Sequence, residues 1–271
     1  MKNNEALQQW VTQLSQNELP VLKKTARELA AMRAHESTLT VTAISNVIAR
    51  DPMMTVKLLR YLQQHKHKAQ TTEVIQIEQA LMMLGIEPFF THVQAKPVVE
   101  DMLSAHAMAI PPLLRVVHRS HRASQYAQEW AAQRHDLHFE EIRIAALLHD
   151  IAEMLMGCFA PEAMLQIRTL QQQDKTLRSQ LVQQHVLGFS LIELQKELAL
   201  RWGLPHLLLS LMDDTQKNQA RVRNVTLAIN LARHSANGWD DAALPDDYTE
   251  IGELLHLPLE QVKVLLREGR E

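Results

Sequence analysis

Cysteine, glycine and aromatic residues are scarce in this chain of 271 residues. The single cysteine, Cys158, excludes an intrachain disulfide and a zinc site built from several cysteines, and it fits a reducing compartment. The 7 glycines are too scattered to form a phosphate-binding P-loop or a dinucleotide fingerprint, and no G-x-S-x-G elbow is present. The sequence therefore lacks the motifs of P-loop kinases, dehydrogenases and elbow-type hydrolases.

Long apolar runs and an excess of charge of one sign are also missing. No stretch reaches the roughly 18 to 20 apolar residues of a membrane helix, and the start, MKNNEALQQW, has no apolar signal-peptide segment. The formal net charge is -3, from 28 basic and 31 acidic side chains, so we expect no attraction to nucleic acid or anionic membranes. The composition indicates a cytoplasmic protein.

The residues that are abundant favour helix. Hydrophobic residues make up 46% of the chain and aromatic residues only 4%, and apolar side chains recur at helical spacing almost throughout. We therefore expect an all-α fold. Pro97 should kink or break the helix that Glu87-Pro88 opens, and HSANGWDDAALPDDY (234–248) should be a loop. The other predicted helices cover 7–14, 22–30, 40–49, 52–62, 77–84, 112–134, 139–157, 161–173, 177–186, 188–202, 205–213, 218–236 and 259–267.

The doublet Pro111-Pro112 is the strongest interruption in the chain. A proline disfavours helix at the residue before it and is tolerated in the first turn of a new helix. We therefore expect two packed helical subdomains, residues 1–108 and 109–271.

Residues 145–155, AALLHDIAEML, place an adjacent His149-Asp150 pair inside an apolar run. A buried charge needs a partner or a metal. His118 and His121 lie three residues apart on the preceding helix and share a face, so they could supply further metal ligands. The alternatives are a metal site made of His118, His121, His149 and Asp150, or a largely buried hydrogen-bonded pair that fixes two helices, which we favour.

Several segments resemble the HDOD (HD-related output domain) family of the HD superfamily. AALLHDIAEML resembles the His-Asp motif, whereas ELPVL (18–22), VIARDPMMTVKLLR (47–60) and IEQALMMLG (77–85) resemble the N-terminal signature. Downstream, LGFSLIELQKELALRWGLP (187–205) and VTLAINLARHSANG (225–238) resemble later family segments. The resemblance implies a multi-helix HDOD/HD-like fold and a bacterial signalling role.

The chain departs from the family pattern at positions that bind metal and phosphate in HD phosphohydrolases. Those enzymes hold a divalent metal with a first His, the His-Asp pair and a late Asp, and at the late position this chain has Asn230, a weak neutral ligand. Glu153 stands where a phosphate-contacting Lys is common. Leu191 and the stretch 212–214 replace histidines that relatives often carry.

We therefore expect a vestigial site of His118, His121, His149, Asp150 and Asn230 without catalytic residues or cofactor. The chain would act as a regulatory module that binds a ligand or an unidentified protein partner of a signalling pathway. The alternative is a metal-dependent phosphohydrolase acting on a nucleotide or phosphoester. A nucleic-acid-binding regulator would need concentrated positive charge, which the sequence lacks.

Two other features have ordinary structural interpretations. HRSHR (118–122), with Arg115, gives a basic stripe that could dock an acidic partner or a phosphate, although a solvated helix face is the simpler interpretation. Cys158 has no activating partner in the sequence, so we expect a small core residue and not a nucleophile.

Overall fold

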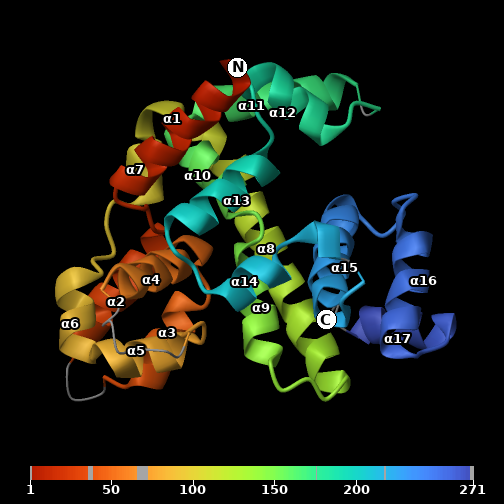
Figure 1. Cartoon of the computed structure of the whole chain (residues 1–271), viewed down its shortest axis with the longest axis horizontal. Coiled ribbons are helices and arrows are strands. Elements are labelled where there is room, and N and C mark those ends of the chain that lie inside the picture. The colour runs from red at the N-terminus through yellow and green to blue at the C-terminus, as the bar shows by residue number, and fades with distance from the viewer. Residues whose placement is uncertain (1, 36–38, 66–72, 175, 217, 269–271) are drawn as a thin grey trace. The chain divides into compact units, whose positions relative to one another are not determined.

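The computed structural model describes residues 2–35, 39–65, 73–174, 176–216 and 218–268 (Figure 1). These residues form helices joined by short connections, and one isolated parallel bridge, Val21 to Val98, is the nearest that the described chain comes to a strand. The predicted all-α fold is confirmed. Within these residues no single helix combines the length and the apolar composition needed to cross a membrane, and the segments 139–159 and 161–173 reach them only when taken together across a sharp bend.

The chain divides into two compact units, each built from two separate stretches. The first unit comprises residues 1–117 and 150–205, and the second comprises residues 118–149 and 206–271. The predicted boundary between residues 108 and 109 thus lies inside the first unit, and the division into packed subdomains 1–108 and 109–271 stays a prediction.

Most of the helices lie entirely within one unit, and α8 (Ile110–Gln133) contributes to both. The first unit also contains α1 (Lys2–Gln16), α2 (Lys23–Arg33), α3 (Val41–Ile48), α4 (Pro52–Gln64), α5 (Ile77–Leu84), α6 (Ile86–His92), α7 (Val99–Met102), the 3-10 helix η2 (Ser104–Ala109), α10 (Ile151–Phe159), α11 (Pro161–Gln173), α12 (Ser179–Leu187) and α13 (Leu191–Arg201). The second unit also contains α9 (Phe139–Leu148), α14 (His206–Leu211), η3 (Asp214–Gln216), α15 (Ala220–His234), η4 (Ser235–Asn237), α16 (Leu244–Leu255) and α17 (Leu259–Glu268).

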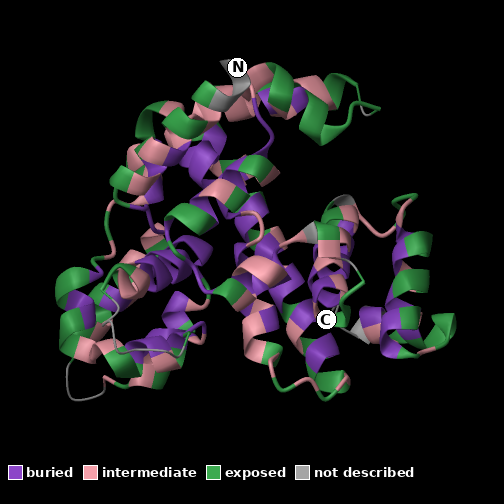
Figure 2. Ribbon diagram, in the orientation of Figure 1, coloured by how far each residue is buried: buried purple, intermediate pink, exposed green. Residues whose placement is uncertain are grey.

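Helix α4 forms the core of the first unit. Every residue from Pro52 to Arg60 is buried, because α3, α5 and α10 all pack against this helix (Figure 2). Its start follows from the sequence: the Asp51 carboxylate accepts the main-chain N–H groups of Met53 and Met54, and Pro52 occupies the first turn. A helix buried on all sides is unusual outside a protein core.

Two long-range contacts complete the first unit. Helix α1 packs along α13, and Gln8 Nε2 donates a hydrogen bond of 3.3 Å to Glu197 Oε2 there. The beginning of α8 lies close to α10 at Gly157, where an added Cβ would stand 3.3 Å from Leu113 Cδ1. Glycine at this position therefore permits a close approach of the two helices.

Helix α15 forms the centre of the second unit. It packs against α9, α14 and α16, and its side chains from Val222 to Ala232 are mostly buried (Figure 2). Asp247 in the first turn of α16 accepts a hydrogen bond of 2.6 Å from His234 Nδ1 when that ring nitrogen is protonated. Trp130 of α8 is 1% exposed and stacks on Tyr126 with 5.8 Å between ring centroids.

The structure corrects one predicted loop and confirms one predicted break and one predicted helix start. Helix α16 begins at Leu244, so the loop expected over 234–248 ends earlier than predicted. Pro245 in the first turn, followed by two aspartates, is a helix start that the loop assignment overlooked. The chain leaves the helical path between α6 and α7 around Pro97, and Pro111-Pro112 lies in the first turn of α8, as expected.

Candidate functional site

The His149-Asp150 pair lies at a break between two helices. Helix α9 ends at Leu148 and α10 begins at Ile151, so the continuous helix predicted over 139–157 is wrong at this point. His149 keeps helical angles, but Asp150 has φ -100° and ψ 21°, which turns the chain. Both residues are half-buried, so they are neither core residues nor fully exposed.

A buried glutamine supports this turn from within the first unit. Gln195 on α13 is 3% exposed, and its Oε1 accepts the Ala152 N–H over 2.9 Å. The Asp150 side chain makes no capping hydrogen bond to α10. The amide of Gln195 therefore satisfies a donor in the first turn of α10 that a capping side chain often satisfies.

The remaining site candidates belong to the second unit. His118 on α8 is exposed and His121 is half-buried. Asn230 is half-buried on α15, which packs against α9, the helix that ends beside His149. Helix α9, which ends one residue before His149, and the helix that carries Asn230 are thus neighbours. A contact from the His-Asp pair to the helix of His118 and His121 stays a prediction.

The donor set does not fit a divalent metal centre. No group of three or more His, Cys, Asp or Glu side chains among the described residues could hold a metal ion. Asn230, which the family resemblance puts at the position of the late aspartate, carries an amide, which is neutral and a weaker ligand. Ligation of a metal by His118, His121, His149 and Asp150 therefore stays a prediction from the sequence.

The arginines of the basic stripe differ in their surroundings. Arg115 is exposed, as a solvated helix face would have it. Arg122 is half-buried: its guanidinium lies 5.8 Å from the Tyr126 ring centroid and 5.6 Å from that of Trp239. Its Nη2 donates a hydrogen bond of 2.8 Å to the Tyr126 hydroxyl. The sequence predicted the positive charge at Arg122 but not these aromatic contacts, because Trp239 is distant in the chain.

Two buried cations on α4 were also missed by sequence reasoning. Lys57 Nζ lies 2.8 Å from Glu18 Oε2 and donates to the carbonyls of Leu19 and Lys96 at 3.2 and 2.5 Å. Burial lowers the pKa of Lys57, and Glu18 opposes that shift. Arg60 donates to the carbonyls of Leu14 and Asn17. Both cations thus fix the connection between α1 and α2 by binding its main chain.

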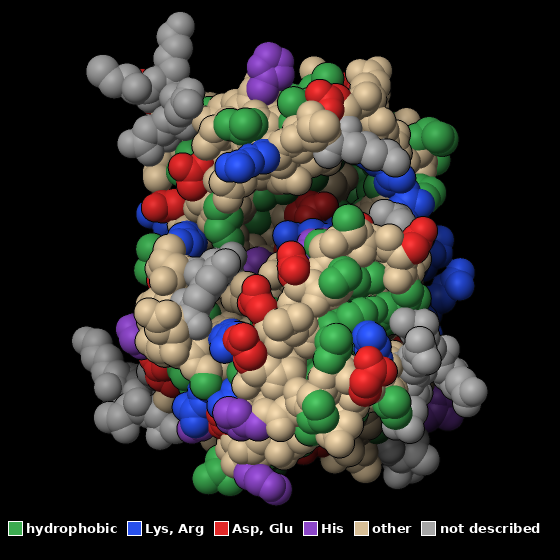
Figure 3. Space-filling view, turned by 90° about the vertical axis from the view of Figure 1, so that its right-hand side faces the viewer, with side chains coloured by type: hydrophobic (Ala, Val, Ile, Leu, Met, Phe, Trp, Pro, Cys, Tyr) green, Lys and Arg blue, Asp and Glu red, His purple; other side chains and the backbone are tan. Residues whose placement is uncertain are grey.

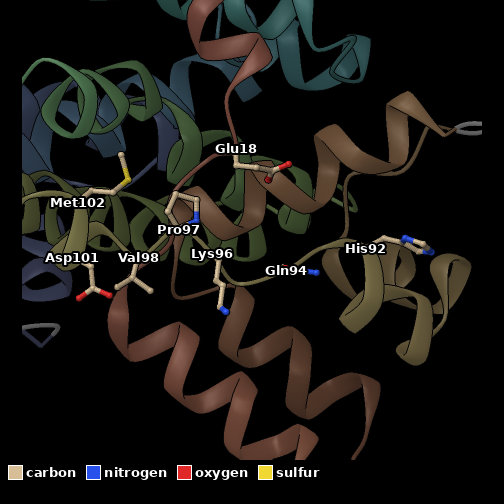
Figure 4. Close-up of a pocket in the computed structure, with 8 residues that line it drawn as sticks. All are labelled: Glu18, His92, Gln94, Lys96, Pro97, Val98, Asp101 and Met102. Atoms are coloured by element: carbon tan, nitrogen blue, oxygen red, sulfur yellow. The ribbon is translucent and has the colours of Figure 1, made fainter.

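A surface pocket of about 780 Å³ lies beside Lys57 in the first unit (Figure 4). The segment after α6 forms one wall, and its carbonyls at Lys96 and Pro97 accept hydrogen bonds from Lys57 Nζ and the Val21 N–H. Figure 4 shows that the charged side chains of Glu18 and Lys96 do not converge on one point. Small-molecule sites usually have several polar groups that point at the same ligand. This pocket lacks such an arrangement between Glu18 and Lys96.

Cys158 is a core residue, as the sequence indicated. The side chain is 5% exposed, and burial raises the pKa of its thiol to about 12, with Asp51 and Glu100 adding to the shift. A thiol that stays protonated at neutral pH is a poor nucleophile.

Comparison with known proteins identifies the family. The model of the HDOD domain matches residues 19–217. The fold is similar to that of the response regulator MmoQ from Methylococcus capsulatus strain Bath, with 19% identity, a TM-score of 0.68, and coverage of 93% of this chain and 98% of that one. It is also similar to a virulence factor from Campylobacter jejuni (18% identity, TM-score 0.65, 93% and 88% covered).

A third solved structure, an HDOD domain protein of unknown function from Geobacter sulfurreducens, has 16% identity, a TM-score of 0.52, and coverage of 97% of this chain and 93% of that one. At these identities the likeness shows the fold alone. No curated protein matches the chain. The family model, in contrast, covers most of the sequence and includes the His-Asp pair. The chain therefore belongs to the HDOD domain family.

Proposed function

We propose that the chain is a non-catalytic signalling module of a bacterial cytoplasm, which regulates a partner by binding it. The feature that carries this proposal is Asn230, which the family resemblance puts where an HD phosphohydrolase needs a carboxylate. Among the described residues, no three His, Cys, Asp or Glu side chains lie close enough together to hold a metal ion. Water activation by a metal requires enough fixed ligands to hold the ion while one position stays open.

The described surface and one fold relative are consistent with protein partners. Acidic and basic side chains are interspersed on the face shown in Figure 3, where a nucleic-acid-binding protein would have a positive field. A structure of the same fold is described as a response regulator. Binding a protein, without nucleic acid or membrane, is therefore the role that we assign to this chain.

The test combines metal analysis with a substrate panel. Protein purified without chelator should contain no stoichiometric divalent metal, and it should release no phosphate from nucleotides or generic phosphoesters with Mg²⁺, Mn²⁺ or Ni²⁺. The His149→Ala and Asp150→Ala variants serve as controls for the site. Turnover well above background that disappears in both variants would overturn the proposal and establish a phosphohydrolase.

Replacing Asn230 by Asp gives a matched variant. This change restores the carboxylate at nearly constant volume, so it should raise the affinity for Mn²⁺ or Ni²⁺ if the vestigial arrangement is intact. An unchanged affinity would show that more than the missing carboxylate prevents metal binding.

A further inference from the structure

Arg122 of the second unit has a fixed orientation. Its guanidinium contacts the rings of Tyr126 and Trp239, and Nη2 donates to the Tyr126 hydroxyl. Tyr126 is 8% exposed and stacks on the buried Trp130, so it moves little. We call Arg122, Tyr126 and Trp239 the Arg122 cluster. A guanidinium held in this way loses little conformational freedom when it binds a ligand.

The charge of Arg122 has no counter-charge in the part of the chain that the structure describes. Its interactions there are those with the two rings and the phenol oxygen, and none of them is a carboxylate. Its other N–H donors are available to a ligand, since the side chain is only half-buried. A half-buried cation without an anion favours an oxyanion beside it.

The composition of the cluster indicates the kind of ligand. Arginine, tyrosine and tryptophan are the residue types most enriched among those that dominate protein–protein binding energy. The planar fork of a guanidinium matches the two oxygens of a carboxylate. We propose that the Arg122 cluster is the docking point for an Asp or Glu side chain of a protein partner, an inference that rests on the proposed regulatory function.

Arg115 supplies a matched control on the same helix. It carries the same charge and is exposed, but no ring in the described chain lies over it. Burial and then the charge of Arg115 lower the pKa of another cation, Arg168, so Arg115 lies near a like charge. A partner that responds only to positive charge would lose affinity equally when either Arg115 or Arg122 is neutralised.

The experiment measures protein retained from nuclease-treated extract of the native cells on immobilised wild type, Arg115→Gln, Arg122→Gln and Tyr126→Phe. Wild type and Arg115→Gln should retain the same protein. Arg122→Gln should retain roughly 10- to 100-fold less, the loss expected for one charged hydrogen-bonded pair. Tyr126→Phe, which removes only the hydroxyl that orients Arg122, should show a smaller loss. Unchanged circular dichroism would confirm that the variants fold.

A second measurement identifies the contacted group. In an Arg122→Lys variant, a carbodiimide activates a carboxylate in contact with the new amine, which attacks it to form an amide bond while the carbodiimide leaves as a urea with the carboxylate oxygen. Peptide mapping should place this bond on an Asp or Glu of the retained protein. An Arg115→Lys variant should give far less of the product.

The outcomes separate this inference from the proposed function. Equal retention by Arg122→Gln and wild type would leave the regulatory module standing and overturn the Arg122 cluster as its docking point. Retention of no protein by wild type would overturn the proposed function, and this inference with it. Retention from an untreated extract that is lost in the nuclease-treated extract would assign a nucleic-acid ligand and overturn both.

Discussion

Replacing Asp51 by Ala tests whether one buried carboxylate connects two parts of the first unit. Asp51 is fully buried, and it accepts the N–H of Leu22 at 2.8 Å as well as those of Met53 and Met54 at 3.0 and 3.1 Å. The two helix donors make it an ordinary N-cap, whereas the Leu22 contact comes from the start of α2, far earlier in the chain.

The magnitude follows from these separate contacts. Loss of an N-cap costs about 0.5 to 2 kcal/mol, and a buried N–H left without an acceptor costs about 1 to 3 kcal/mol. We therefore expect Asp51→Ala to lower the free energy of unfolding by roughly 2 to 5 kcal/mol. At about 2 °C per kcal/mol for a protein of this size, Tm should fall by at least about 4 °C.

Urea and thermal unfolding, followed by circular dichroism, provide the measurement. The control is Thr40→Ala, which removes an exposed N-cap with one acceptor contact, to the Ala43 N–H at 3.1 Å. It should cost about 1 kcal/mol. The loss of stability in Asp51→Asn should lie between those of Asp51→Ala and Thr40→Ala. The asparagine oxygen can still accept an N–H, but its NH₂ group would face at least one other N–H donor. If Asp51→Ala costs no more than Thr40→Ala, the contact to Leu22 contributes nothing and the reasoning fails.

Three further predictions concern the surroundings of the His-Asp turn. Gln195→Ala should lower stability by about 1 to 3 kcal/mol and speed hydrogen exchange at the Ala152 amide, and unchanged exchange would contradict the capping role. Gly157→Val should cost about 1 to 3 kcal/mol because Leu113 occupies the space, so an unaltered Tm would argue against close packing. Cys158 should not react with a thiol reagent at pH 8 until the chain is unfolded. Because its folded pKa of about 12 exceeds the ordinary 9.0, the stability that the protonated thiol contributes is complete below pH 9 and is lost as the pH rises through 12.

The sequence was sufficient to predict helices whose ends are set by residues within a few positions. Asp51-Pro52 marked the start of α4 correctly, because a cap and a first-turn proline act within a few residues. The same type of signal at Leu244-Pro245 was overlooked, because the polar residues on both sides resembled a loop. The break at His149-Asp150 could not be read from periodicity, since the apolar run continues unchanged across it.

The candidate site was less predictable than the fold. Asn230 was proposed from the family resemblance, but an apolar sequence does not show that the His-Asp pair lies at a turn of the chain. The roles of Lys57 and Gln195 depend on partners tens of residues away, Lys96 and Ala152. Contacts over such distances leave no trace in local sequence pattern.

The packing of α1 against α13 has a consequence for the order of synthesis. The surface that covers the N-terminal helix is not made until residues 191–201 have been added, and Gln8 meets Glu197 only then. At about 5 to 20 residues per second, the ribosome needs roughly 10 to 40 s for the intervening chain. During that time the apolar side chains Val11 and Leu14, which are buried in the finished protein, have no α13 to pack against. The nascent chain is thus a candidate for chaperone binding at its first helix, and closure of this contact is a late step in folding.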